Sequence, residues 1–226
     1  MAEKKFEKAT AGERLSQFML RHRMPIIVFA AVVVVAIVVY GISAAVVSSS
    51  RAKGISFVDT VEYDLTNDSA SLSDAEIESK RSDAMTKLTP YLGRGGIVGV
   101  RANMLAAGIA YGRKDYATAK SYWTAAAAKG AKSYTAPLAY YNIAVCDENT
   151  GNLADAAAGY GKAADEKDFP LASHARFSEG RVYEALGDYK KASESYAKLS
   201  ASALGDAWTN LAETRLIALK AEGKIE

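Results

Sequence analysis

The chain has 226 residues, a formal net charge of +2, and hydrophobic side chains at half of its positions. This length suits one or two domains. The nearly balanced charge gives no electrostatic footprint for nucleic acid, so no nucleic-acid partner is expected. The one cysteine, Cys146, cannot form an intramolecular disulfide or a metal cluster, and no cofactor is expected. Abundant alanine and only four prolines predict an all-α body.

Residues 1–24 form a polar and charged stretch with six cations and three anions. A weak apolar stripe would appear on a helix here, formed by Phe6, Leu15, Phe18, Met19 and Leu20. We interpret the stretch as a solvated cytoplasmic tail whose charge helps to set membrane topology.

Residues 25–47, from Pro25 to Val47, contain no charged side chain. A membrane-spanning helix needs about 20 mainly apolar residues, and this stretch supplies them. Arg21 and Arg23 directly precede it, which predicts a cytoplasmic N-terminus and an exported body. A cleaved signal peptide is the main alternative, but its hydrophobic region is usually only about 7 to 15 residues long.

Three segments that begin at Lys114, Gly151 and Gly187 align without gaps, at spacings of 37 and 36 residues. Each has an acidic or amide residue, a large apolar residue, an alanine, an aromatic residue and a further apolar residue at the same offsets. The matched positions are Asp115, Tyr116, Ala119, Trp123 and Ala126, then Asn152, Leu153, Ala156, Tyr160 and Ala163, then Asp188, Tyr189, Ala192, Tyr196 and Leu199. Such a period predicts a repeat architecture.

The matched positions fit the second helix of a helical hairpin. The alanine marks a close helix crossing, and the aromatic residue fills the gap between neighbouring repeats. Gly151 and Gly187 suit a left-handed cap, and Asp115, Asn152 and Asp188 suit the next N-cap. We place the first helices at Val100–Tyr111, Pro137–Glu148 and Ser173–Ala185, with the small residues Ala107, Ala144 and Gly180 inside them.

These segments resemble the tetratricopeptide repeat family, whose period is about 34 residues. The family's first-helix signature is matched by Gly180 and Tyr183 and, near the end of the chain, by Trp208, Leu211 and Ala212. The resemblance implies an all-α solenoid of antiparallel helix hairpins after one N-terminal transmembrane helix. We assign three repeats to residues 100–204 and a terminal capping helix to 205–226, as solenoids require.

Residues 48–99 would form a helical linker. Ser73 and Glu76 suit a capping box that begins a helix running to Leu92, after which several glycines break the chain. A second helix within residues 55–65 would pair with it as a degenerate first hairpin.

No pattern of residues points to catalysis, and the chain is not expected to be an enzyme. Gly93–Gly96 is neither a dinucleotide nor a phosphate loop. Cys146 fits a small core residue, and His174 alone does not make a metal site. Residues 67–69 form a glycosylation sequon, a short pattern that is common by chance.

In the family that the chain resembles, first helices build the concave face of the array. That register implies a peptide groove lined by Arg101, Met104, Tyr111, Tyr141, Glu148, His174, Phe177 and Arg181. The alternative is that several of these side chains belong to the core or to the plain surface, and the sequence leaves both interpretations open.

The order of tail, single span, helical linker and repeats resembles the ancillary Sec translocon subunit family. This resemblance implies a single-pass protein of the bacterial inner membrane with its C-terminal domain in the periplasm. Its partners would be the translocon, periplasmic chaperones or exported clients, and self-association stays open. The alternative is a structural scaffold of a cell-envelope assembly, such as a flagellar or cell-wall machine.

Overall fold

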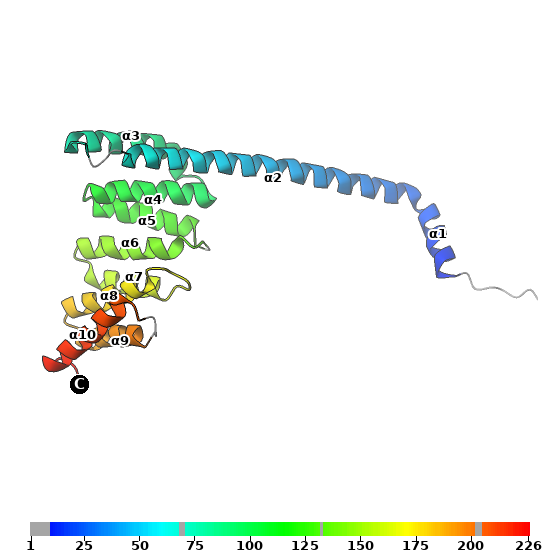
Figure 1. Ribbon diagram of the computed structural model, residues 1–226. Coiled ribbons are helices and arrows are strands. Elements are labelled where there is room, and N and C mark those ends of the chain that lie inside the picture. The colour runs from blue at the N-terminus through cyan, green and yellow to red at the C-terminus, as the bar shows by residue number, and fades with distance from the viewer. Residues whose placement is uncertain (1–9, 68–70, 132, 202–204) are drawn as a thin grey trace, which may run out of the picture. The chain divides into compact units, whose positions relative to one another are not determined.

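The computed structural model describes residues 10–67, 71–131, 133–201 and 205–226 (Figure 1). These residues form ten helices and no strand, which confirms the predicted all-α fold. The chain divides into two units, residues 1–52 and 53–226. Two residues of the glycosylation sequon, Asp68 and Ser69, lie outside the described residues.

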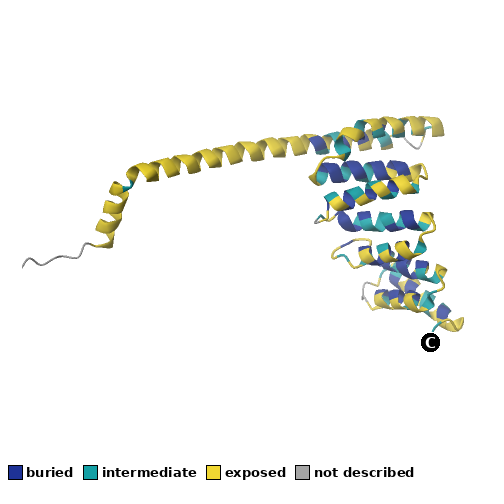
Figure 2. Ribbon diagram, turned by 180° about the vertical axis from the view of Figure 1, so that it is seen from behind, coloured by how far each residue is buried: buried dark blue, intermediate teal, exposed yellow. Residues whose placement is uncertain are grey.

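The first unit contains α1 (Ala11–Arg21) and the beginning of α2 (Arg23–Thr66). Thr10 and Glu13 form a capping box at the start of α1, so the second half of the expected tail is helical. The residues of α1 and of the apolar stretch of α2 are exposed (Figure 2). By length and composition, α2 is able to cross a membrane.

Helix α2 continues beyond the apolar stretch as far as Thr66, so residues 55–65 are helical but do not form a separate helix. The segment after Val47 contains no proline and only one glycine, Gly54. Gly54 is buried, and a Cβ atom there would lie 2.9 Å from Cγ1 of Val98 in α4 (Gly96–Gly112). This glycine therefore allows two helices to approach closely and does not end α2.

Helix α3 (Asp74–Leu92) begins with the predicted capping box of Ser73 and Glu76 and runs through Pro90 to the predicted end. The end of α2, α3 and α4 share one hydrophobic core in the second unit. Its buried members are Val58, Val61, Ala84, Leu88, Ala102, Ala106 and Ile109.

Three helical hairpins and a last helix complete the second unit (Figure 1). Each helix packs mainly against its neighbours in the sequence, and the last helix also contacts α8. The hairpins are α4 with α5 (Tyr116–Lys129), α6 (Ala136–Asn149) with α7 (Leu153–Ala164), and α8 (Ala172–Ala185) with α9 (Tyr189–Ser200), followed by α10 (Ala207–Ala221).

The matched positions of the second helices are buried as the repeat pattern predicts. The recurring alanine has no exposed surface in any copy, and the aromatic residue four positions later is at most 8% exposed. These residues are Ala119 and Trp123 in α5, Ala156 and Tyr160 in α7, and Ala192 and Tyr196 in α9. Close helix crossings at alanine therefore set the spacing inside each hairpin.

The turns inside the hairpins use one backbone geometry. Gly151 and Gly187 have φ of 78° and 74°, as predicted, and Lys114 takes the same left-handed form with φ of 62°. Asp115 and Asp188 cap the next helix, with oxygens 3.1 Å from the backbone nitrogens of Thr118 and Lys191.

Two expectations about helix boundaries were wrong. Asn152 stands at the N-cap of α7, but its side chain donates to the Thr150 hydroxyl instead of accepting from the helix. Helix α4 begins at Gly96, four residues before the predicted start. A Cβ atom at Gly99 would collide with the carbonyl oxygen of Arg94, so this glycine lets the chain turn tightly into α4.

Candidate protein-interaction surface

Four aromatic side chains form a continuous cluster across α6, α8 and α10, which we call the aromatic cluster: Tyr141, His174, Phe177 and Trp208. The Tyr141 hydroxyl lies 3.1 Å from Nδ1 of His174. The His174 ring stacks on Trp208 with centroids 4.0 Å apart, and Phe177 lies 5.5 Å from the same indole. All four side chains are half-buried, so each packs on its neighbours and also keeps a face toward solvent.

An ion pair between two first helices lies beside this cluster. Both terminal nitrogens of Arg181 donate to Glu148, at 2.6 and 2.7 Å. The Tyr160 hydroxyl donates to the same carboxylate at 2.9 Å. The hydrogen bonds from Arg181, with Tyr160 adding to them, hold the pKa of Glu148 below its usual value against the opposing effect of burial. The pair therefore links α6, α7 and α8 as a charged, hydrogen-bonded group.

The same arrangement recurs one repeat later. Tyr196 donates to Glu184 at 2.6 Å, and Arg215 of α10 donates to both oxygens of that carboxylate. The sequence separation between tyrosine and glutamate is 12 residues in both copies. We call each set of tyrosine, glutamate and arginine a clasp, because it joins both helices of one hairpin to the next first helix.

The other three predicted groove residues lie on α4. Arg101 forms an ion pair of 2.6 Å with Asp59 near the end of α2. Met104 packs against the hydrophobic core shared by α4, α5 and α6. Tyr111 is exposed and makes an edge contact with Tyr116 at 5.2 Å. Five of the eight predicted residues thus lie together on α6 and α8, in the aromatic cluster and the ion pair beside it. The other three are on α4 and contact α2, the shared core or Tyr116.

None of the eight predicted residues is fully buried: Tyr111 and Arg181 are exposed, and the others are half-buried. Sequence reasoning assigned Trp208 only to the capping helix and Tyr160 only to repeat packing. It also missed Glu184, although Glu184 follows Glu148 at the repeat spacing of 36 residues. That spacing was the available signal for the second clasp.

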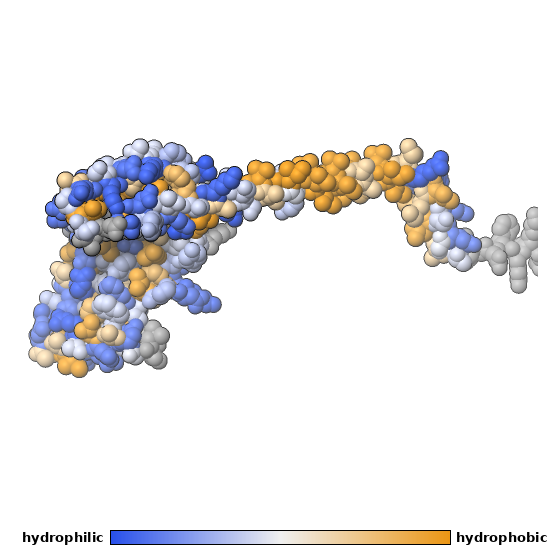
Figure 3. Space-filling view, turned by 45° about the horizontal axis from the view of Figure 1, so that its top comes forward, coloured by the Kyte–Doolittle hydropathy of each residue, from blue (hydrophilic) through white to orange (hydrophobic). Residues whose placement is uncertain are grey.

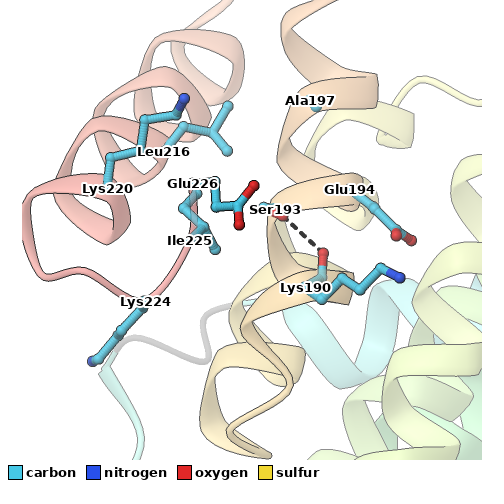
Figure 4. A pocket seen from close by; sticks show the side chains of 9 residues that line it. All are labelled: Lys190, Ser193, Glu194, Ala197, Leu216, Lys220, Lys224, Ile225 and Glu226. Carbon is cyan, nitrogen blue, oxygen red and sulfur yellow. Dashed lines mark hydrogen bonds between the residues drawn. The ribbon is translucent and has the colours of Figure 1, made fainter.

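Surface hollows among the described residues include two that involve second helices, and neither of these contains a predicted groove residue. The larger, about 740 Å³, lies between α9 and α10 (Figure 4). Leu216 and Lys220 project from α10 on one side, Ser193 and Ala197 lie on α9, and Glu226 lies between them. The smaller, about 480 Å³, runs along α5 to the start of α7.

The chemistry of the side chains matches a binding surface better than a reaction centre. Cys146 is 1% exposed, and burial, with the neighbouring Asp147 charge adding to it, raises the pKa of its thiol to about 11. A thiol in this state is a poor nucleophile. Among the described residues, no group of three or more histidine, cysteine, aspartate or glutamate side chains is placed to hold a metal ion.

The fold is therefore an all-α array of tetratricopeptide-like hairpins that follows an apolar N-terminal helix. The chain is 32% identical over 130 residues to a TPR repeat-containing protein of Treponema pallidum (strain Nichols). The match covers 58% of this chain and 54% of that relative, so the chain spans about half of the relative's length. No protein-family model matches the chain, and no solved structure matches it.

Proposed function

We propose that this chain is a membrane-anchored scaffold that binds proteins on the periplasmic side of a bacterial inner membrane, as an ancillary component of the translocon or of its chaperones. The observation that carries the proposal is the aromatic cluster beside the Glu148–Arg181 pair on adjacent first helices. Half-buried aromatic side chains and an arginine are the residue types that dominate protein-binding surfaces. The similarity to a TPR repeat-containing protein supports a role in protein–protein interaction.

The predicted groove fits this role as a discontinuous surface. Tyr141, His174 and Phe177 would contact apolar side chains of an extended or helical segment. Glu148 and Arg181 would flank them with opposite charges. Arg101, Met104 and Tyr111 would extend the surface along α4. Because Glu148 and Arg181 already bind each other, a charged partner would have to compete with that pair, whereas the aromatic faces are ready for contact.

The anchor rests on residues 25–47, which are uncharged and exposed on all faces of α2. A helix with this composition is stable in lipid because its backbone hydrogen bonds are made internally. The cations before it favour a cytoplasmic N-terminus. In this proposal residues 1–24 face the cytoplasm, 48–99 carry a degenerate first hairpin, 100–204 form three repeats and 205–226 cap the array.

Site-specific photo-crosslinking in intact membranes tests the binding surface. A photoreactive phenylalanine analogue at Phe177 should capture a defined protein, whereas the same analogue at Tyr134, which is 86% exposed on a loop, should not. Capture of translocon or periplasmic chaperone proteins at Phe177 supports the proposal. Capture of flagellar or cell-wall components supports the alternative scaffold, and equal capture at both positions contradicts a specific surface.

Membrane topology needs a separate measurement. We expect protease added to spheroplasts to degrade the hairpin array without membrane disruption, and an N-terminal tag to remain protected. Recovery of the chain in the soluble periplasmic fraction would instead favour cleavage of the apolar segment.

A further inference from the structure

We infer that α1 is an interfacial helix that lies on the same membrane that α2 crosses and binds anionic lipid headgroups. This inference rests on the proposed membrane anchor and goes beyond it. It replaces the interpretation of residues 10–24 as a solvated tail with a second, shallow contact to the bilayer.

The first observation is the apolar stripe on α1. Ala11, Leu15, Phe18 and Met19 follow the spacing i, i+4, i+7 and i+8, which places them on one helix face. Leu15, Phe18 and Met19 are 60%, 56% and 52% exposed. Helix α1 has no buried residue, so nothing else in the described chain covers this face. An uncovered stripe of this kind on a short helix is typical of helices that lie in a membrane interface.

The second observation is the positive charge on one flank of the stripe. Arg14, Gln17 and Arg21 follow each other at i, i+3 and i+7, and the two arginines lie next to the stripe, one turn before and one turn after Phe18. The acidic residue of α1, Glu13, is held in the capping box, where its carboxylate accepts from the Thr10 backbone at 2.8 Å. Arginine side chains can extend from the flank of the helix to lipid phosphates while the apolar face enters the acyl boundary.

The third observation is the position of α1 in the chain. Only His22 separates Arg21, the last residue of α1, from Arg23, the first residue of α2. If residues 25–47 cross the bilayer, the C-terminal end of α1 lies at the level of the headgroups, so the helix cannot move far from them. The His22 ring lies 4.7 Å from the Phe18 ring, between the apolar stripe and the span. Figure 3 shows the hydrophobic first part of α2 beside hydrophobic and hydrophilic side chains on α1.

These observations favour a lipid bilayer over a protein as the occupant of this face. The apolar stripe is short, one of its flanks is cationic, and the membrane is already within reach at no added cost of association. Anionic lipids of the cytoplasmic leaflet complement the arginines, and each basic side chain near such a surface strengthens the attraction.

The test uses the full chain with Cys146→Ala, reconstituted in vesicles of phosphatidylcholine and phosphatidylglycerol. An environment-sensitive fluorophore is attached in turn at Leu15→Cys, Phe18→Cys and Gln17→Cys, with Val35→Cys as the reference for the span. Spin-labelled lipids serve as quenchers. We expect quenching at Leu15 and Phe18 to be at least about two-fold stronger than at Gln17, and strongest with quenchers near the headgroups. Unchanged fluorescence of Trp123 and Trp208 verifies that each variant keeps its folded array.

A second arm tests the lipid charge. The double variant Arg14→Gln/Arg21→Gln should reduce quenching at Phe18 in the mixed vesicles but not in pure phosphatidylcholine. An equal effect in both kinds of vesicle would overturn the headgroup assignment.

The label at Val35 distinguishes failure of the interfacial helix from failure of the membrane anchor. Equal quenching at Leu15 and Gln17, with Val35 deeply quenched, overturns the interfacial helix and leaves the anchor intact. A blue-shifted signal at Phe18 that lipid quenchers do not reach would mean that protein covers the stripe, which also overturns the inference. Absence of quenching at Val35 would contradict the anchor itself.

Discussion

The hydroxyl of Tyr160 lies 2.9 Å from Oε2 of Glu148, the carboxylate that also binds Arg181 of the next hairpin. Tyr196 and Glu184 repeat this relationship at 2.6 Å. In repeat arrays, stability comes largely from contacts between neighbouring repeats. The clasp therefore adds a polar, directional bond to an interface that otherwise depends on small and aromatic side chains.

Removing the tyrosine hydroxyl tests the contribution of the clasp. We expect Tyr160→Phe to lower the free energy of unfolding by about 1 kcal/mol, because the partly buried hydrogen bond to Glu148 is lost while the ring still packs. Urea unfolding of the full chain in detergent measures this through tryptophan fluorescence, since Trp123 and Trp208 both lie in the second unit. The control, Tyr134→Phe on an exposed loop, should leave the midpoint unchanged. An equal loss in both variants would remove the argument for the clasp.

Gly180 should not tolerate even a methyl group. A Cβ atom there would lie 2.5 Å from Cε1 of Tyr196, whose ring is completely buried and cannot move away easily. We expect Gly180→Ala to destabilise the array by about 1 to 3 kcal/mol. Gly108→Ala is the matched control, because a Cβ atom there would have no atom within 4 Å beyond its own helix backbone, and the change should gain up to about 1 kcal/mol in helix propensity. Stabilisation by both changes would contradict the packing described here.

The N-caps of the second helices should differ in strength. Asp115 accepts from the backbone of Thr118, so Asp115→Ala should cost about 1 kcal/mol. Asn152 makes no such bond with α7, so Asn152→Ala should lower the free energy of unfolding by only about 0.3 kcal/mol. The same urea measurement compares them, and equal losses would show that Asn152 caps its helix after all.

The stability of the array should fall as the pH drops below about 7. Burial lowers the pKa of His174 below its ordinary value of 6.5, and the charge of Arg181 adds to this. As the pH falls through 6.5, His174 takes up a proton in the unfolded chain before it does so in the folded chain. The free energy of unfolding therefore decreases until the pH is below the pKa of His174 in the folded chain.

His174→Gln tests the assignment of this pH dependence. The variant should be less stable at every pH because the stacking on Trp208 is lost, but its midpoint should change less between about pH 7.5 and 5.5. Glu148 acts in a separate window: its pKa is lowered, so its contribution is lost only below its ordinary value of 4.5. Midpoints measured across both windows separate the two groups, and an unchanged slope in His174→Gln would refute the role of this histidine.

The features that sequence reasoning predicted correctly depend on residues close together in the chain. The left-handed turns at Gly151 and Gly187, the capping box of Ser73 and Glu76, and the burial of the recurring alanine all follow from local spacing. The capping box of Thr10 and Glu13 has the same local spacing. The apolar composition of residues 25–47 likewise needs no tertiary information.

Contacts between helices were beyond this kind of reasoning. Glu148 and Arg181 are 33 residues apart, and their pairing depends on the angle at which one hairpin packs on the next. The same holds for His174 on Trp208, because a stacked pair requires two particular rotamers on two separate helices. The continuation of α2 to Thr66 was also unexpected, and the close approach of its Gly54 to Val98 depends on the packing of two separate helices.

By itself, therefore, the sequence determined an all-α repeat protein with one long apolar helix, since helix period, caps and turns are encoded within a few residues of each other. Only the tertiary structure decided which first-helix side chains form a connected surface and which are held by neighbouring elements. The physical reason is that a groove residue is defined by what lies across from it, and that depends on the packing of helices far apart in the chain.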